Sequence, residues 1–324
     1  MGRAAGTGSE NDDPAPASVA SRACYLIARM SSRVIRLLPR SLCLWGGNRV
    51  ADVALVLART YRANAMANFR QVLGPDVPAK EVRRTAHEAF RTSVQNMIDL
   101  LRFQRLTPAA LARTIGVGED HWSVIAAALS QGRGLILLTG HLGAFDSLSQ
   151  LPAGRGYPMT VVLGRTLPRP IFDAAVALRQ AHGMTVIEAT PLGVRSLIEA
   201  LRRGECVGFL GDRDFFGNGT LVEFFGRRTT LPSGAVRLAR ETGAPILAAY
   251  LRRTPTGYDL LLEEPFCVAR TAHRNADVAA GMDRVVASLT RAVAATPGQW
   301  AMFQPVWPAD DASTNSASRC ASSS

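Results

Sequence analysis

The sequence predicts an α/β fold with a mostly parallel central sheet flanked by helices, and a helical N-terminal region packed on it. From residue 133 onward, short apolar runs typical of buried strands alternate with helical segments, whereas residues 22–130 read as helical. The chain of 324 residues is 47% hydrophobic and 19% charged. It is therefore long and apolar enough to bury a sizeable core.

The N-terminal region is expected to contain long helices. Residues 49–69 are rich in Ala and lack Pro and Gly, and residues 79–105 form a second helical stretch after a Gly- and Pro-containing break. Thr107 stands before Pro108, which is typical of an N-cap followed by Pro at the first helical position.

The remainder of the chain predicts the sheet and the helices that cover it. Strands are expected at residues 135–138, 160–163, 185–187, 206–210, 246–251 and 260–262. Helices are expected at residues 144–150, 171–181, 192–203, 233–242 and 275–295. Strands that alternate with helices in this way favour parallel pairing.

The composition of the two ends differs from that of the interior. Residues 1–20 are polar and rich in Ala, Pro, Asp and Ser, and residues 309–324 are Ser-rich, so we expect both to be disordered tails. They bracket a helical region, residues 21–130, and an α/β core, residues 131–308. No signal-peptide core and no stretch of 18 uncharged apolar residues is present, so a conventional transmembrane helix is not expected.

The five cysteines are odd in number, scattered and without metal-ligand spacing. This pattern indicates a reducing compartment and no structural metal.

Positive charge is concentrated near the N-terminus. The chain carries a net charge of +11, and residues 22–72 contain nine arginines and one acid, Asp52, a net of +8. Arg29, Arg33, Arg36 and Arg40 fall within about 60° of one another on a helical projection, opposite an apolar side. Such a helix either lies on an anionic membrane or packs on the protein core with its arginines solvated. Aromatic residues make up only 6% of the chain and no stacking motif accompanies the arginines, which disfavours nucleic acid as a partner.

His141 and Asp146 form the most informative pattern in the chain. They follow the apolar run 135–138, which Gly140 breaks. On one continuous helix their side chains would lie about 140° apart, but a His in the turn and an Asp one turn into the next helix can converge. A carboxylate bonded to one ring nitrogen leaves the other nitrogen to accept a proton from a hydroxyl. The spacing also permits a simpler interpretation, in which His141 caps the helix and Asp146 favours its dipole.

Three further motifs follow this pair in order. They are Gly211-Asp-Arg-Asp214, Leu221-Val-Glu-Phe-Phe-Gly226 and the segment 233–245, which ends in Thr-Gly-Ala-Pro. Together with the H-x4-D pair they resemble the bacterial lipid A biosynthesis acyltransferase family, within the wider glycerolipid acyltransferase superfamily. The resemblance covers roughly residues 50–305, and the later motifs are much more specific than H-x4-D alone. Phosphatidylinositol mannoside acyltransferases of actinobacteria resemble the chain almost as well.

The resemblance implies roles for the H-x4-D pair. It makes His141 the general base and Asp146 its orienting partner. Attack on the acyl donor would then be direct, because Ser147 is the only serine nearby and no G-x-S-x-G elbow is present for a covalent hydrolase mechanism.

Asp212, Arg213 and Asp214 are the main candidates for substrate binding. They follow the expected strand 206–210, and the carboxyl ends of parallel strands lie on the same side of a sheet as His141. Arg213 could contact a phosphate, and the two acids could bind sugar hydroxyls or orient Arg213. A solvated acidic turn is the alternative.

Other candidates are less specific. Arg165 resembles the basic substrate-binding position of the superfamily, or it is a plain surface charge. Glu223 is a second carboxylate candidate near His141. Four phenylalanines line an acyl channel or pack in the core: Phe215, Phe216, Phe224 and Phe225.

The resemblance implies an O-acyltransferase. The donor would be an acyl thioester, acyl-CoA or acyl carrier protein, and the acceptor a hydroxyl of a membrane glycolipid of the lipid A type. A phosphatidylinositol mannoside or a lysophospholipid is the alternative acceptor. A lipid-binding protein without turnover and a soluble hydrolase are rivals of other classes. No cofactor or metal is expected, and the protein is expected to be peripheral, on an anionic membrane surface at the cytoplasmic face of the inner membrane.

Overall fold

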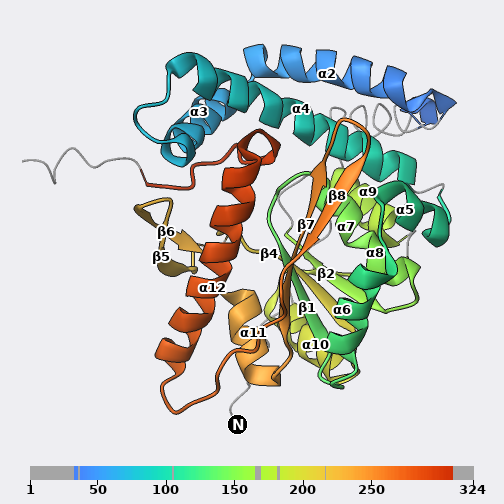
Figure 1. The fold of residues 1–324 in the computed structure, drawn as a ribbon, viewed down its shortest axis with the longest axis vertical. Coiled ribbons are helices and arrows are strands. Elements are labelled where there is room, and N and C mark those ends of the chain that lie inside the picture. Colours follow the sequence, from blue (N-terminus) through green and yellow to red (C-terminus); the bar gives the residue numbers. More distant parts are fainter. Residues whose placement is uncertain are drawn as a thin grey trace, which may run out of the picture.

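The computed structural model describes residues 33–308, apart from residues 36, 104–105, 165–168, 181–182 and 216. A six-stranded sheet in the order β3-β2-β4-β1-β7-β8 lies at its centre, and all neighbours are parallel except β7 and β8 (Figure 1). The strands are β1 (Leu135–Thr139), β2 (Met159–Leu163), β3 (Met184–Glu188), β4 (Cys206–Leu210), β7 (Ile246–Arg253) and β8 (Tyr258–Leu262). All six expected strands and the α/β fold class are confirmed.

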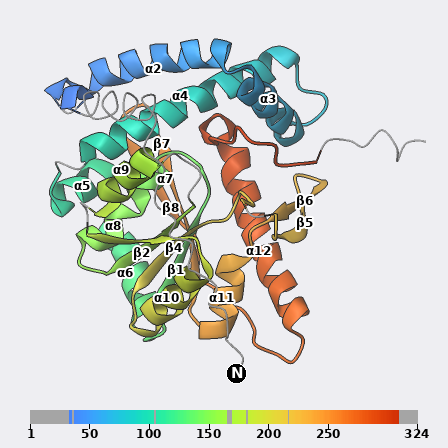
Figure 2. The same ribbon diagram turned by 180° about the vertical axis from the view of Figure 1, so that it is seen from behind.

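Helices cover both faces of this sheet (Figures 1 and 2). One face packs on α10 (Pro191–Arg202), α11 (Gly234–Thr242) and α12 (Arg274–Ala295). The other face packs on α5 (Pro108–Ile115), α6 (Glu119–Leu129) and α8 (Gln150–Gly154). The short helix α7 (Phe145–Leu148), the helix α9 (Arg169–Gln180) and the 3-10 helix η1 (Pro297–Gln299) complete this part of the chain.

The central strand β1 shows why its sequence is a continuous apolar run. Leu135 and Leu137 belong to the hydrophobic core on one face of the sheet, and Ile136 and Leu138 to the core on the other. Successive side chains of a strand point to opposite faces, so a parallel sheet covered on both faces requires apolar residues at every position.

The N-terminal helices form a layer at one end of the molecule (Figure 1). They are α2 (Arg40–Leu57), α3 (Arg59–Leu73) and α4 (Ala79–Phe103). The layer packs on the core as expected: Thr92 donates to the carbonyl of Gly298 at 3.2 Å, and Asn68 to that of Met302 at 3.2 Å. The Thr107 N-cap of α5 is also confirmed, because its side chain accepts from the amide of Ala110.

The expectation of one continuous helix over residues 49–69 is wrong. The chain breaks at Ala58, whose ψ of 65° is not helical, and α2 and α3 meet there at 94°. The bend lets α3 turn down onto the core, where Phe69 is fully buried against Trp300. Within the described residues no single helix is long and apolar enough to cross a membrane, although α2 and α3 taken together meet that criterion by length and composition.

The hairpin of β5 (Thr220–Phe224) and β6 (Arg227–Leu231) was not expected from the sequence. Its two-residue turn has Phe225 at φ 49° and Gly226 at φ 72°, the left-handed pair that a tight hairpin requires. Phe224 is fully buried and stacks on Trp307, with ring centroids 5.7 Å apart. The burial shows that Phe224 is a core residue.

Several expectations fall on residues outside this description. The two expected tails, residues 1–20 and 309–324, lie there, and so do Arg29 and Arg36 of the expected basic helix. Of that stripe, Arg40 is not a plain solvated charge: it donates to the hydroxyl of Tyr258 at 2.9 Å and lies 3.5 Å from the buried carboxylate of Asp99. The domain boundaries remain predictions.

Candidate functional site

The register of two neighbouring strands brings His141 to Asp212. β1 and β4 run parallel, with Thr139 opposite Leu210, and each strand is followed by a single glycine. The next residue on each side is therefore His141 and Asp212. The ring Nδ1 of His141 lies 2.8 Å from Asp212 Oδ1, and the backbone amide of His141 donates to Asp212 Oδ2 at 2.7 Å.

The loop that carries His141 is held on both sides by backbone hydrogen bonds. The carbonyl of His141 accepts from Ala301 at 2.8 Å, and the amide of Gly143 donates to the carbonyl of Gln299 at 2.9 Å. Gly143 has φ 60°, and a Cβ there would lie 2.1 Å from the carbonyl oxygen of Leu251. Only glycine fits this position, because both the backbone conformation and the close approach exclude a side chain.

Asp212 is a fully buried carboxylate with three donors. Besides the two bonds to His141, its Oδ2 accepts from the indole Nε1 of Trp300 at 2.8 Å. Burial opposes ionisation of this carboxyl, but the charge and hydrogen bonds of His141 and the hydrogen bond of Trp300 outweigh it, so the pKa of Asp212 lies below its usual range. A negative charge is thus fixed behind the imidazole.

The imidazole of His141 sits at the edge of the interior. Its side chain is 16% exposed, and its ring packs edge-on against Phe145 with centroids 5.1 Å apart. Because Nδ1 is held by Asp212, Nε2 is the nitrogen left for a substrate, and no hydrogen bond to it occurs within the described part of the chain. A ring fixed at Nδ1 by a carboxylate and reachable at Nε2 can accept a proton from a hydroxyl.

Asp146 does not orient His141 in this structure. Its carboxylate forms an ion pair with Arg179 of α9 and accepts from the amide of Asn96 of α4 at 3.1 Å. The expectation that the H-x4-D carboxylate bonds the ring is therefore corrected. Asp146 points from α7 toward α4 and α9 and ties these helices to the site, whereas the strand register places Asp212 against the ring.

Arg213 and Asp214 follow Asp212 in the loop after β4. The guanidinium of Arg213 lies 3.8 Å from the ring centroid of Phe215, and burial lowers the pKa of Arg213 despite the nearby charge of Asp212. Asp214 accepts from the backbone amide of Gly219 at 2.8 Å, so part of its hydrogen-bonding capacity holds the loop. Asp212 is buried and therefore is not a solvated acid.

The structure does not bring every other candidate to His141. Glu223 is exposed on β5, on the side of that strand opposite Phe224, whose ring packs 6.0 Å from that of Trp300. No hydrogen bond or ion pair joins Glu223 to His141 among the described residues. Arg165 and Phe216 lie outside the described residues, Phe215 is 40% exposed, and Phe225 is half-buried in the hairpin turn.

Comparison with known proteins gives this geometry its context. The model of the bacterial lipid A biosynthesis acyltransferase family matches residues 18–308. The chain belongs to this family. The match spans the sheet, the His141 loop and the N-terminal helices alike.

Individual members of the family can also be aligned with the chain. Two proteins named phosphatidylinositol mannoside acyltransferase, from Mycobacterium tuberculosis strains CDC 1551 / Oshkosh and ATCC 25618 / H37Rv, are each 31% identical over 229 residues, 69% of this chain and 66% of theirs. A protein of the same name from Mycolicibacterium smegmatis is 30% identical over 197 residues, 59% of this chain and 61% of its own. The chain thus spans somewhat less than two thirds of the length of these relatives.

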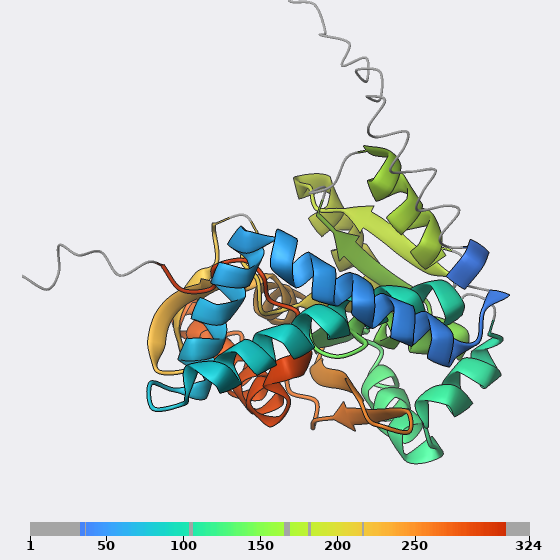
Figure 3. The ribbon, with the colours of Figure 1, turned by 90° about the horizontal axis from the view of Figure 1, so that it is seen from above.

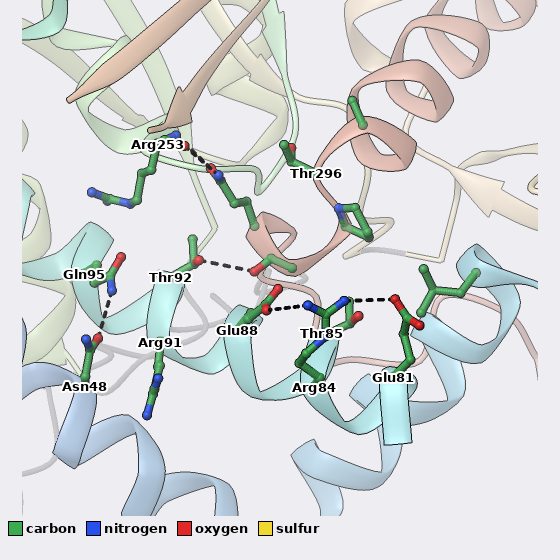
Figure 4. A pocket seen from close by; sticks show the side chains of 15 residues that line it. Asn48, Glu81, Arg84, Thr85, Glu88, Arg91, Thr92, Gln95, Arg253 and Thr296 are labelled. Atoms are coloured by element: carbon green, nitrogen blue, oxygen red, sulfur yellow. Dashed lines mark hydrogen bonds and ion pairs between the residues drawn. The ribbon is translucent and has the colours of Figure 1, made fainter. Parts of the chain in front are cut away.

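A polar pocket of about 490 Å³ lies elsewhere, between α2, α4, the end of β7 and η1 (Figure 4). Its charged side chains are already paired: Arg84 bonds Glu81 at 2.9 Å and lies 3.8 Å from Glu88. His141 does not line it, so it is separate from the site that the family motifs mark.

Two further observations bear on the chemistry. Burial raises the pKa of the Cys206 thiol to about 12, which is the opposite of what a nucleophilic cysteine requires. Among the residues that the structure describes, no group of three or more His, Cys, Asp or Glu side chains is arranged to hold a metal ion.

Trp300 is the residue of this site that the sequence did not identify. It lies 88 positions from Asp212 in the chain, so no local sequence pattern links the two residues. The Asp212 pairing itself had a usable signal, because His141 and Asp212 each come directly after a glycine that lies within two residues of the end of an expected strand, 135–138 and 206–210.

Proposed function

We propose that this protein is an O-acyltransferase that moves a fatty acyl group from an acyl thioester to a hydroxyl of a membrane glycolipid. The observation that supports it best is the His141–Asp212 pair at the carboxyl end of the central strand, in a chain that belongs to a lipid acyltransferase family. The donor is acyl-CoA or acyl carrier protein, and neither metal nor redox cofactor takes part.

In the proposed reaction the acceptor oxygen attacks the thioester carbonyl carbon while Nε2 of His141 takes its proton. The C–S bond then breaks, the acyl group stays on the acceptor as an ester, and the thiolate leaves and takes the proton from the ring. Asp212 holds the Nδ1–H tautomer and stabilises the imidazolium that forms in between. Such general-base help contributes about 10²–10⁴-fold in rate.

The names of the family and of the relatives support the proposed acceptor class. The family model is named for lipid A biosynthesis, whereas the three aligned relatives are named for phosphatidylinositol mannosides. Both acceptors are phosphorylated glycolipids with sugar hydroxyls. In this proposal the half-buried Arg213 contacts the acceptor or donor phosphate, and Asp214 and Arg165 stay candidates for substrate contact.

The test is transfer by the purified full chain in detergent micelles containing acyl-CoA and either a lipid A precursor or a phosphatidylinositol mannoside. Expected is one free thiol per acyl ester formed, with the acceptor seen by mass spectrometry to gain one acyl group. The variant His141→Ala should lose about 10²–10⁴-fold in rate, and His273→Ala, at an exposed histidine, should keep the wild-type rate.

Other outcomes would contradict the proposal. Free fatty acid released at the same rate without acceptor would indicate a hydrolase. Glycolipid binding with no thiol release, unaffected by His141→Ala, would indicate a lipid-binding protein without turnover.

A further inference from the structure

Helix α2 turns its bulky apolar side chains away from the protein. Seven of its residues share one exposed arc of about 140° at 100° per residue: Leu42, Trp45, Arg49, Val50, Val53, Val56 and Leu57. We call this set the α2 outer face. Trp45 is 61% exposed and Leu57 74%. Six of the seven are apolar, so the face resembles a core face that has no partner within the described chain.

The inner face of the same helix is made of small residues. Cys43, Gly47 and Ala51 are spaced by four, are buried and face α4. A Cβ on Gly47 would lie 2.4 Å from the Ile98 side chain, so the two helices pack closely. Packing within the fold therefore uses the small residues of α2, and it does not explain why the large apolar ones lie on the opposite side.

The charge around the α2 outer face is positive. The described residues between 33 and 75 include six arginines and one acid, Asp52. The carboxylate of Asp52 accepts from Arg91 Nε at 2.8 Å and bonds His87, so it is largely neutralised. Arg49 lies in the face itself with 64% of its side chain exposed, and Arg59 is exposed just past the bend. An apolar face that contains one exposed arginine and has a second just past the bend complements a layer of anionic lipid headgroups.

The α2 outer face is also placed suitably with respect to the catalytic site. Figures 1 and 2 show α2 as the outermost helix at one end of the molecule, and Figure 3, seen from that end, shows it lying over α4. On its other side, α4 reaches the site through Asn96, which donates to Asp146. Two helix layers, α2 itself and α4, thus lie between the face and the helices around His141, a depth of about 20 Å at about 10 Å per helix.

We propose that the α2 outer face docks flat on an anionic lipid surface, with Trp45 inserted among the headgroups and upper acyl chains. The proposal rests on the proposed function in that a membrane-bound glycolipid is the acceptor. Docking keeps the His141 site within about two helix layers, about 20 Å, of the membrane that presents the acceptor hydroxyl. The occupant of the face is lipid, because its apolar side chains match the acyl chains and its arginines match the anionic headgroups.

Tryptophan fluorescence offers a direct test with the full chain. Trp122, Trp300 and Trp307 are buried, so Trp45 is the one exposed tryptophan of the four in the sequence. Vesicles of phosphatidylglycerol and phosphatidylcholine should shift its emission to the blue and shield it from acrylamide. Phosphatidylcholine brominated at different depths should quench it most strongly near the headgroup boundary, about 5–10 Å deep. High salt should weaken the binding.

Val53→Glu places a charge in the middle of the α2 outer face without touching the core. Vesicle affinity should fall about tenfold or more, with an unchanged melting temperature. The matched control is Val194→Glu on α10, where the valine is 53% exposed, close to the 56% of Val53. This control should bind vesicles like the wild type.

The remaining outcomes overturn the docking proposal. If Val53→Glu and Val194→Glu lost the same amount of vesicle affinity, the α2 outer face would not be the surface that binds the membrane. A dimer that Val53→Glu dissociates, seen by light scattering without lipid, would assign the face to a second copy of the chain. Quenching strongest at the bilayer centre would indicate insertion across the membrane.

Transfer to an acceptor in detergent micelles separates the two proposals. If Val53→Glu keeps that activity but no longer binds vesicles, both stand. Vesicle binding through Trp45 without any acyl transfer would overturn the function and leave the docking.

Discussion

The variant Asp212→Asn should lower the rate of acyl transfer by about 10³-fold. Its carboxylate lies 2.8 Å from His141 Nδ1, so the charge centres of an imidazolium and this carboxylate would be about 4 Å apart. At an effective dielectric constant of about 20, that attraction is about 4 kcal/mol, which corresponds to about three orders of magnitude in rate. An amide also presents a donor to Nδ1, which favours the tautomer whose Nε2 cannot accept a proton.

Thiol release from acyl-CoA in the presence of acceptor measures this effect. The informative comparison is Asp146→Asn, which removes the partner of Arg179 and should lower the stability by about 3 kcal/mol. Because Asp146 does not touch the ring, its variant should keep transfer within about tenfold of wild type at a temperature where both are folded. If Asp146→Asn lost as much activity as Asp212→Asn while folded, the reasoning from the observed pairing would be refuted.

Three further predictions follow from the same geometry. Trp300→Phe removes the indole N–H that donates to the Asp212 carboxylate, and a hydrogen bond to a charged group contributes about 1.5–3 kcal/mol. We therefore expect kcat to fall at least about tenfold with little change in KM. An unchanged kcat would show that Trp300 does not position Asp212. Gly143→Ala would place a side chain on a residue with φ 60° and a Cβ 2.1 Å from the carbonyl oxygen of Leu251, so the free energy of unfolding should fall by at least about 2 kcal/mol. The control is Gly46→Ala, whose Cβ would meet nothing within 4 Å and which should not lower the melting temperature. Because the pKa of Asp212 is lowered in the folded state, its ionisation stabilises that state above about pH 4, the ordinary pKa of Asp, and this stabilisation is lost as the pH falls through the lower folded-state pKa. In urea melts, the free energy of unfolding should therefore decrease less below about pH 4 in Asp212→Asn than in wild type. The same dependence of the unfolding free energy on pH in both proteins would contradict the assignment.

The fold was predictable because its elements are encoded locally. The apolar run of β1 and the helix-forming segments between strands predict strands and helices one at a time, and their alternation favours a parallel sheet. The hairpin β5–β6 escaped prediction because its strands mix polar and apolar residues and its turn uses Phe225 at positive φ in place of the usual Asn or Gly.

The α2–α3 break escaped prediction for a different reason. Residues 49–69 contain neither Pro nor Gly, so the intrinsic preferences alone give no stop. The bend at Ala58 is compensated by tertiary burial, because it allows Phe69 to pack against Trp300.

The sequence by itself determined the six strands of the central sheet with the helices between them, the family, and the histidine that follows the first strand. Only the tertiary structure decided that Asp212, and not Asp146, bonds that histidine. The reason is that strand order and register depend on how the whole sheet packs, and the parallel β1–β4 pair places residues 71 positions apart side by side. The same holds for α2: both of its faces are apolar in sequence, and close contact with α4 selects the small one for burial and leaves the bulky one outside.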